Sequence, residues 1–351
     1  MKTKILLVTH KPFKIPSGNA FVPILAGADV ALTNNKDGKI SKNDLEWLQT
    51  FCIFDNSGEN ISSKNRLYSE CSALYWAWKN FEQIGNPEYI GLMHYRRHFI
   101  FNEDYYLNSK QSKLEKALGY ISADFINDRY IKNIQLNDKI IDEFTDKYDL
   151  IVSIDSDLSK INDGRNIRTD YAETIAGTKV KDFDLMLEIL CSKYPQYQEL
   201  IKTKVNGYKK SLYQMFIMKK ELFFEYCNFL FPILFELEEK IDFSEYSTNG
   251  KRSLGYLAEE LLAIFVWIKE AEENLRIKKL GCTLVRFPYE EQTIKEMLNK
   301  QPPSYFEYLK LKIKSYFLSG DAKQENKEQY QRIRNMRKDY FYLKKITKGA
   351  I

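Results

Sequence analysis

Short apolar runs alternate along the chain with stretches of helical periodicity. Buried strands are predicted at residues 4–10, 28–34, 89–93, 213–220 and 280–287, and residues 139–155 repeat the step from helix to strand. Helices are predicted at residues 63–81, 180–204, 221–240 and 253–272. This alternation predicts an α/β fold in which helices flank a mostly parallel sheet, and such sheets bind ligands at the carboxyl ends of their strands.

The end of the chain differs in charge from the rest. From Glu307 onward there are twelve Lys or Arg residues against five Asp or Glu, whereas the whole chain carries +5, so the first 306 residues are near −2. We therefore expect a globular domain over residues 1–300 and a basic, amphipathic helical tail over residues 301–351. The tail could dock on anionic lipid, or it could be a solvated extension or an oligomer contact.

Several classes of protein are disfavoured. The longest apolar runs fall far short of the roughly 20 residues that cross a bilayer, and the N-terminal segment lacks the features of a secretory signal. Five widely spaced cysteines without a CxxC pair predict neither a disulfide framework nor a zinc site. The slightly acidic domain has no nucleic-acid-binding motif. These features predict a cytoplasmic protein that does not bind nucleic acid.

A dense cationic cluster, HYRRH at residues 94–98, directly follows one predicted strand and holds two of the three histidines in the chain. Arginine has the planar fork that binds phosphate in a bidentate manner, and histidine can add a donor. The chain has neither a GxGxxG fingerprint nor a P-loop to bind phosphate in another way. The cluster therefore suggests an anion site at the end of this strand.

Two points about this cluster stay open. If the strand continues, His94 and Arg96 point to one face of the sheet and Tyr95 and Arg97 to the other, so one ligand would meet only part of the cluster. The alternative to an anion site is a solvated strand end, at which the arginines pair with the carboxylates at residues 103–104.

Two acidic residues, Asp155 and Asp157, follow the strand predicted to end near Ile154. Carboxylates one residue apart at a strand end can chelate Mg²⁺ or Mn²⁺ that bridges a diphosphate. A polar turn after a strand would have the same sequence, so the metal site and the turn are both possible interpretations.

A further acid lies on the helix predicted at residues 253–272. Arg252, Gly255, Tyr256 and Glu259 share one helical face, which lies beside an apolar stripe. Partial desolvation at this border would raise the pKa of Glu259 toward the range of a general base. The alternative is an exposed acid that pairs with Arg252.

An aromatic candidate, Trp76, lies on the helix predicted at residues 63–81, on the same face as Asn65, Ser69 and Ser72. Its indole could stack on a base or a sugar. Alternatively, it packs beneath a loop as a core residue.

Taken together, these stretches resemble a bacterial family defined by a domain of unknown function, found in capsular, exopolysaccharide and O-antigen loci and classed among glycosyltransferases. The resemblance runs from about residue 5 to residue 270 and leaves out the tail. The similar blocks, in the family's order, are THKPF with Pro16, PILAGAD, ENISSKN, YSECSALYWAWKNF, YIGLMHYRRHF, MFIMKKELFFEYCNFLF, and Arg252 through GYLAEELL.

The resemblance implies a GT-A-like, Rossmann-related transferase that moves a sugar from a nucleotide diphosphate donor to a glycan on a lipid carrier. Some members are associated with galactofuranose, which makes UDP-galactofuranose the first donor to test. HYRRHF would occupy the strand end where many GT-A enzymes carry an Asp-x-Asp metal motif. The family pattern does not include the DSD sequence, so no metal cofactor is favoured, although Mg²⁺ or Mn²⁺ remains possible.

The resemblance also implies a set of donor-binding residues. Direct neutralisation of the diphosphate by His94, Arg96 and Arg97 is expected, because fixed cations stabilise charge on a leaving group. The other expected donor-binding residues are His10, Lys11, Asn60, Ser62, Asn65, Trp76, Tyr95 and Arg252. Two positions depart from the family pattern: Glu260 stands where Arg is common, and Gln214 where Asn is common.

The sequence therefore predicts a hexosyltransferase for polysaccharide synthesis at the cytoplasmic face of the membrane. Glu259 is the leading general base if the reaction inverts configuration, and Asp155 is the reserve base or metal ligand. The alternative is a non-catalytic protein of a polysaccharide locus that binds nucleotide sugar or glycan as a regulator or scaffold.

Overall fold

The chain forms two compact units, Met1–Pro288 and Tyr289–Ile351. The division comes a little before the boundary at residue 300 expected from composition. Among the described residues, all strands belong to the first unit and the second unit is helical. The computed structural model describes residues 2–33, 40–161, 165–174, 177–289, 291–299, 302, 304–314 and 320–347.

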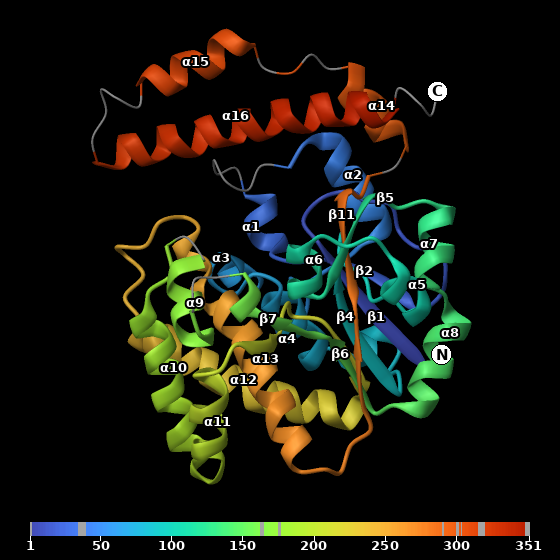
Figure 1. Ribbon diagram of the computed structural model, residues 1–351, viewed down its shortest axis with the longest axis vertical. Helices are drawn as coiled ribbons and strands as arrows, with labels where there is room; N and C mark the ends of the chain where they lie inside the picture. Colours follow the sequence, from blue (N-terminus) through green and yellow to red (C-terminus); the bar gives the residue numbers. More distant parts are fainter. Residues whose placement is uncertain are drawn as a thin grey trace. The chain divides into compact units, whose positions relative to one another are not determined.

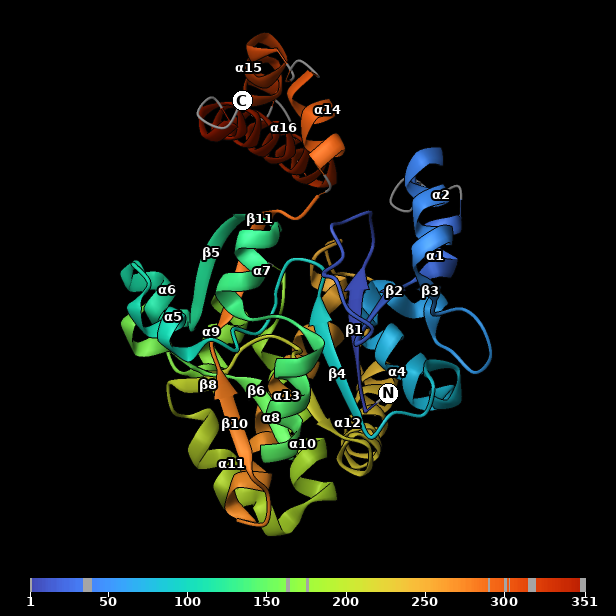
Figure 2. The same cartoon turned by 90° about the vertical axis from the view of Figure 1, so that its right-hand side faces the viewer.

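A seven-stranded sheet runs through the first unit (Figures 1 and 2). Every neighbouring pair is parallel except the two pairs of β9, which is antiparallel to β4 and β6. The strand order is β10 (Ile277–Leu280), β6 (Leu150–Ser153), β9 (Phe216–Lys219), β4 (Tyr89–His94), β1 (Thr3–Thr9), β2 (Phe21–Leu25) and β3 (Ile53–Phe54). The predicted α/β fold with a mostly parallel sheet is confirmed.

Two smaller sheets flank the main one. β11 (Cys282–Phe287) pairs in parallel with β5 (Tyr120–Phe125). β7 (Asp155–Asp157) pairs in antiparallel fashion with β8 (Lys209–Ser211). Residues 155–157, where the sequence allowed a polar turn, therefore form a short strand.

The main sheet is buried on both faces. Successive residues of a strand point to opposite faces, so Leu6 and Val8 join one apolar cluster while Ile5 and Leu7 join another. The first cluster includes residues of α4 (Cys71–Lys79), α10 (Val180–Lys193), α12 (Lys220–Lys240) and α13 (Ser253–Ala271). The second includes residues of α7 (Asp128–Ile134) and α8 (Asp138–Lys147). Near-continuous apolar strands are expected in such a three-layer arrangement.

The remaining helices are mostly short. Those of the first unit are α1 (Ala28–Leu32), α2 (Lys42–Phe51), α3 (Asn65–Tyr68), α5 (Glu103–Asn108), α6 (Lys113–Leu118), α9 (Ile167–Thr174), α11 (Gln198–Val205) and the 3₁₀ turns η1 (Ser62–Lys64), η2 (Phe81–Ile84), η3 (Leu158–Lys160), η4 (Pro195–Tyr197) and η5 (Gly250–Arg252). Those of the second unit are α14 (Glu291–Asn299), α15 (Tyr305–Lys314) and α16 (Gly320–Thr347).

The strand predicted at residues 28–34 is wrong. Residues 28–32 form helix α1, residue 34 lies outside the described residues, and the strand beside β1 is β2. A short apolar run fits a strand or a helix equally well, and Pro23 argued against placing a strand at residues 21–25. Gly27 adopts a left-handed conformation with φ of 72°, which turns the chain from the strand into the helix.

The helix predicted at residues 63–81 is broken in its middle. α3 ends and α4 begins on either side of Ser69 and Glu70, and Ser69 has a φ of 50°. Such a value is uncommon for a residue with a side chain. The periodic pattern of apolar residues continues across the break, which is why the sequence suggested one helix.

The second unit is a helical assembly of its own, as predicted for the tail. Tyr308 of α15 stacks on Tyr330 of α16 at 4.9 Å between ring centroids, and their hydroxyl oxygens are 2.7 Å apart. Asn326 donates a hydrogen bond of 2.8 Å to the carbonyl oxygen of Leu311. Within the described parts of the chain, no helix is long and apolar enough to cross a membrane.

Candidate functional site

The carboxyl ends of several strands meet at one edge of the main sheet. β1, β2 and β4 are adjacent and parallel, and β6 and β10 point the same way because β9 is antiparallel to its two neighbours. Val8 is the register partner of His94, and the backbone N–H of Tyr95 donates to the carbonyl oxygen of Val8 at 3.0 Å. Residues that follow β1 and β4 therefore lie together, where ligands of parallel sheets bind.

The cationic cluster is shaped by a tight turn. β4 ends at His94, and the N–H of Arg97 donates to the carbonyl oxygen of His94 at 3.0 Å. The predicted strand-like alternation of side chains through residue 97 is therefore wrong. Tyr95 is buried, Arg96 is exposed, and the partly buried Arg97 guanidinium lies 4.4 Å from the ring centroid of Tyr213. This cation–π contact fixes one guanidinium at the strand end.

Two buried polar atoms of this turn have no hydrogen-bond partner within the described residues: Nε2 of His94 and Nε of Arg97. Buried polar groups are rarely left unpaired in folded proteins, so each such atom calls for an explanation. Glu103, one of the two carboxylates considered as partners of the arginines, pairs instead with Lys278 at 2.7 Å. An acceptor-rich ligand such as a phosphate would satisfy both atoms.

The two histidines near the sheet edge are neutral at neutral pH. Burial, followed by the nearby Arg97, Arg96 and Arg252, lowers the pKa of His94 to about 3. Desolvation, followed by Lys11, Arg96 and Arg252, lowers the pKa of His10 to about 4. The positive charge near this edge therefore comes from the arginines and from Lys11. The expectation that His94 adds a charge is corrected: as a neutral imidazole it can donate one hydrogen bond.

Other predicted residues surround this edge. The ring of His10 meets the ring of Tyr95 edge-on with centroids 5.3 Å apart, and Nζ of Lys11 lies 5.4 Å from the Tyr95 centroid. Arg252, far away in the sequence, contributes to the potential at both His10 and His94. The structure thus brings His10, Lys11, Tyr95, the arginines and Arg252 into one region.

Glu259 faces the same region from α13. Its Oε2 accepts a hydrogen bond of 3.2 Å from the N–H of Tyr213. Burial, and then the negative charge of Glu70, raises the pKa of Glu259 to about 7, against the opposing effect of Arg97 and Lys210. Its side chain is partly buried. The partial desolvation predicted for this carboxyl is present, and its proton affinity suits a general base near neutral pH.

A second carboxyl, Glu70, was not among the site residues predicted from the sequence. It follows Ser69 at the break between α3 and α4, and burial raises its pKa while Arg252 and Arg97 oppose that rise. Gly255 of α13 lets this segment approach closely, because a Cβ at residue 255 would lie 2.8 Å from Ser69 Oγ. Arg252 Nε donates to the same Oγ at 3.1 Å. No pattern in the sequence marks Glu70, because its position depends on the break at Ser69 and on the contact with Gly255.

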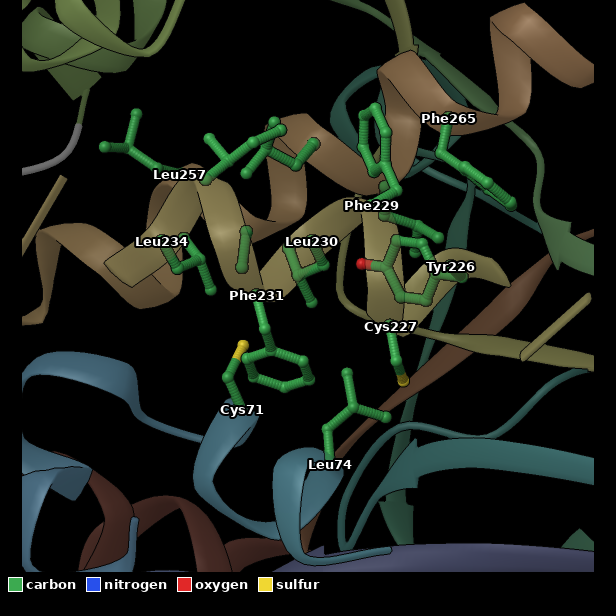
Figure 3. Close-up of a cluster of buried hydrophobic side chains, with 14 of the residues drawn as sticks. Cys71, Leu74, Tyr226, Cys227, Phe229, Leu230, Phe231, Leu234, Leu257 and Phe265 are labelled. Carbon is green, nitrogen blue, oxygen red and sulfur yellow. The ribbon is translucent and has the colours of Figure 1, made fainter. Parts of the chain in front are cut away.

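The residue after Glu70 anchors it in the core. Cys71 is fully buried and, with Leu74 of α4, packs among residues of α12 and α13 (Figure 3). Phe231 and Leu257 belong to the same cluster. The Glu70 backbone is therefore held by a rigid apolar layer. All five cysteines are free, in agreement with the prediction of no disulfide framework.

Asp55 organises the loop that follows β2. Its carboxylate accepts hydrogen bonds from the N–H groups of Gly27 and Ala28, at 2.8 and 2.9 Å, and from the hydroxyls of Ser62 and Ser72, both at 2.6 Å. Ser62 is fully buried. The Ser62 hydroxyl is already hydrogen-bonded to Asp55. Ser62 therefore has a structural role, in place of the expected contact with the nucleotide-sugar donor.

Asn60 and Asn65 also make internal hydrogen bonds. The Asn60 side chain accepts from the N–H of Ser62 at 3.1 Å and donates to the carbonyl oxygen of Gly58 at 3.0 Å. The Asn65 amide donates to the carbonyl oxygen of Ser69 at 2.6 Å and to Ser72 Oγ at 2.9 Å. These residues shape the loop and the break beside Glu70.

Trp76 is a core residue. Its side chain has no exposed surface, and Nε1 donates to Ser57 Oγ at 3.0 Å. The alternative that it packs beneath a loop is the one that the structure supports. A buried indole cannot stack on a base or a sugar, so we leave Trp76 out of the candidate site.

Asp155 and Asp157 are paired with lysines. Asp155 Oδ2 accepts from Lys279 at 2.8 Å, and Asp157 Oδ2 lies 3.1 Å from Lys160 Nζ. Asp157 also accepts from Ser159 at 2.5 Å. Among the residues whose placement is described, no group of three His, Cys, Asp or Glu side chains is arranged to hold a metal ion.

Both departures from the family pattern are buried. Glu260 forms an ion pair with Lys210 of β8, and both side chains are under 10% exposed, at 4% and 6%. Gln214 is fully buried and donates to the Tyr226 hydroxyl at 2.6 Å. Both side chains belong to the interior of the fold.

A surface cavity of about 310 Å³ lies elsewhere, beside the first half of α12 and the last turns of α13. Lys269, Glu225, Glu272 and Tyr197 contribute to its lining. These polar groups already satisfy one another, since Lys269 pairs with both glutamates and the Tyr197 hydroxyl donates to Glu272 at 2.7 Å. We therefore place the candidate site at the sheet edge.

Comparison with known proteins found a similar solved structure and a matching family model. A solved structure, the apo form of the bifunctional glycosyltransferase WbbM, is 28% identical and superposes with a TM-score of 0.69 over 82% of this chain. The match covers 46% of the WbbM chain, so this chain spans about half the length of that protein. No curated protein matches. The family model for a domain of unknown function, DUF4422, matches residues 4–272, and the chain therefore belongs to the DUF4422 family.

Proposed function

We propose that the protein is a glycosyltransferase, specifically a hexosyltransferase, that moves a sugar from a nucleotide diphosphate donor to a lipid-linked glycan in capsule, exopolysaccharide or O-antigen synthesis. The observation that carries this proposal is the pair of buried, unpartnered polar atoms on His94 and Arg97, set among cations at the carboxyl edge of the sheet. The similarity to a bifunctional glycosyltransferase supports the same reaction class. UDP-galactofuranose is the first donor to test.

The diphosphate would be neutralised by Arg96, Arg97 and Arg252, with the neutral imidazole of His94 adding a hydrogen bond. Fixed cations in a partly buried site stabilise charge that develops on a leaving group without needing to reorganise. His10 and Lys11, at the end of β1, would lie along the nucleotide. Direct neutralisation requires no metal ion, and Mg²⁺ or Mn²⁺ would act only as an addition to it.

Glu259 would accept the proton of the acceptor hydroxyl if the reaction inverts configuration. Its raised pKa and its contact with Tyr213, which itself packs on Arg97, support the proposal of a base beside the diphosphate site. Asp155 is the weaker candidate, because Lys279 already occupies one of its carboxylate oxygens. The rival function is a regulator or scaffold that binds the same nucleotide without turnover.

Nucleotide binding tests the site directly. We expect UDP to raise the Tm of the purified protein in EDTA more than GDP, CDP or dTDP does, because a ligand at 100 times its Kd stabilises the folded state by about 2.7 kcal/mol. Transfer from UDP-galactofuranose to an extracted lipid-linked acceptor then separates the enzyme from the rival. Stabilisation that requires Mn²⁺ would contradict direct neutralisation, and no effect of any nucleotide would contradict the donor class.

The second unit is proposed to bring the protein to the inner face of the plasma membrane. Tyr305, Ile313, Met336 and Phe341 are about half exposed or more, on helices that also carry many Lys and Arg residues. Apolar side chains among cations suit anionic lipid, with each cation near the surface worth about 1 kcal/mol. Deleting residues 289–351 should abolish co-sedimentation with vesicles that contain phosphatidylglycerol. Undiminished binding would exclude this role of the second unit.

A further inference from the structure

Glu70 and Glu259 belong to segments that are far apart in the sequence and in contact in the fold. Gly255 lies one helical turn before Glu259 and makes the close contact with Ser69, the residue that precedes Glu70. Arg252 Nε binds Ser69 Oγ at 3.1 Å and so fastens the start of α13 to the same break. The positive φ of 50° at Ser69 ends α3 and turns the chain before Glu70.

Burial opposes ionisation of both acids, and the cations near them have other partners or other proposed roles. Lys210 is committed to Glu260, so Arg97 and Arg252 are the cations left to balance two carboxylates. The same arginines are the groups that the proposed function assigns to the diphosphate. Two neighbouring carboxyls in a desolvated site share a proton, because the charge of one opposes ionisation of the other.

We propose that Glu70 and Glu259 hold one proton between them and act as a pair in accepting the proton of the attacking sugar hydroxyl. This inference rests on the proposed function and deepens it. The acceptor oxygen forms a bond to the anomeric carbon, the bond from that carbon to the diphosphate oxygen breaks, and its electron pair leaves with the diphosphate. The hydroxyl proton passes to the ionised carboxylate of the pair. Glu259 contacts the acceptor hydroxyl, and Glu70 acts through it as a positioning residue.

The groups that face the pair come from five segments of the first unit. Arg97 lowers both pKa values, Arg252 lowers that of Glu70, and Lys210 and the N–H of Tyr213 lower that of Glu259. The groups are Cys71 of α4, Arg97 of the turn after β4, Lys210 of β8, Tyr213 before β9, and Arg252, Tyr256 and Glu260 at or on α13. Apart from burial, the charge of Glu70 is the largest cause of the raised pKa of Glu259.

Substituting Glu70 by glutamine tests the pair in two ways. The first needs no substrate. The folded protein with its raised Glu259 pKa binds more protons than the unfolded chain between pH 4.5 and about 7, so its stability falls as pH rises through this window. In Glu70→Gln the upper limit of the window should move down by about one pH unit. The variant should then have a higher Tm than the wild type at pH 8 and a similar Tm at pH 4.5.

The second readout is kcat/KM for sugar transfer against pH. Its acid limb reports ionisation of the base in the free enzyme, so Glu70→Gln should shift that limb down by about one unit and lower the plateau by about tenfold. Glu259→Gln should lower kcat/KM by about 100-fold, and the double variant should be no worse, since the two residues act as a unit. Glu82→Gln, at an exposed position on η2, is the matched control.

The outcomes separate the pair from the proposed function. Tm profiles of Glu70→Gln and wild type that coincide, or a Tm lowered equally at every pH, would overturn the pair even if transfer is normal. If the losses in kcat/KM of the two single variants multiply in the double variant, the two residues act independently, which would overturn their action as a pair. Absence of transfer by the wild type would overturn the proposed function, while the stability profile would still report on the shared proton.

Discussion

Replacing Arg97 by glutamine should lower kcat/KM for sugar transfer by about two to three orders of magnitude, the typical loss when one preorganised donor to a developing anion is removed. The guanidinium is held at the end of β4 by the ring of Tyr213, 4.4 Å away, and its Nε has no partner within the described residues. It is therefore placed before any ligand arrives. The wild-type and variant enzymes should be compared by initial rates and by the Tm shift with UDP.

Two further variants sharpen this prediction. Arg97→Lys keeps the charge but loses the planar fork, so it should recover only part of the activity. Arg129→Gln removes an exposed arginine from α7, which packs on the other side of the sheet from α13, and should leave the rate unchanged. Activity of Arg97→Gln within threefold of the wild type would exclude Arg97 from diphosphate neutralisation.

The position of the cationic cluster could be predicted from sequence, but its geometry could not. An apolar strand followed by HYRRH places the residues at a strand end, and the structure agrees. The hydrogen bond from Arg97 N–H to the His94 carbonyl oxygen turns the chain, so the alternation of a strand no longer applies. The charge of His94 also depends on burial and on Arg252, and a linear pattern contains neither.

Of the two acids of the site, only one could be predicted from the sequence. Glu259 could be identified because its helical face is visible in the spacing of residues 252–259. Glu70 could not, because its role depends on the break at Ser69 and on the contact with Gly255, both of which are tertiary features. The helical periodicity from Leu67 to Trp78 is real, and it concealed the break.

Polar residues next to a strand end are not all available to a ligand. Ser62, Asn60 and Asn65 seemed suited to bind a donor, yet their hydrogen bonds stay within the loop that Asp55 organises. Trp76 likewise directs its indole N–H to Ser57 inside the fold. Such residues hold the backbone around the site. Only their hydrogen-bond partners, which the structure gives, distinguish them from ligand-binding residues.

Replacing Glu260 by glutamine should destabilise the protein by about 3–5 kcal/mol, because it leaves the ammonium group of Lys210 buried without its carboxylate. Both side chains are more than nine-tenths buried, and the pair joins β8 to α13. The free energy of unfolding should be measured by urea denaturation at pH 8, with the m-value checked for an unchanged unfolding transition. A midpoint equal to that of the wild type would show that the ion pair contributes nothing.

The adjacent residue provides the matched control. Glu259→Gln makes the same chemical change one position earlier, but at pH 8 it removes a carboxylate whose ionisation the fold disfavours, since its pKa is raised to about 7. It should therefore leave stability unchanged or increase it, with the gain disappearing below pH 4.5. Replacing both Lys210 and Glu260 by methionine should restore most of the stability lost in Glu260→Gln, because well-packed apolar side chains can substitute for a buried ion pair. Opposite effects of Glu259→Gln and Glu260→Gln on stability would then distinguish a carboxyl kept for chemistry from one kept for the fold.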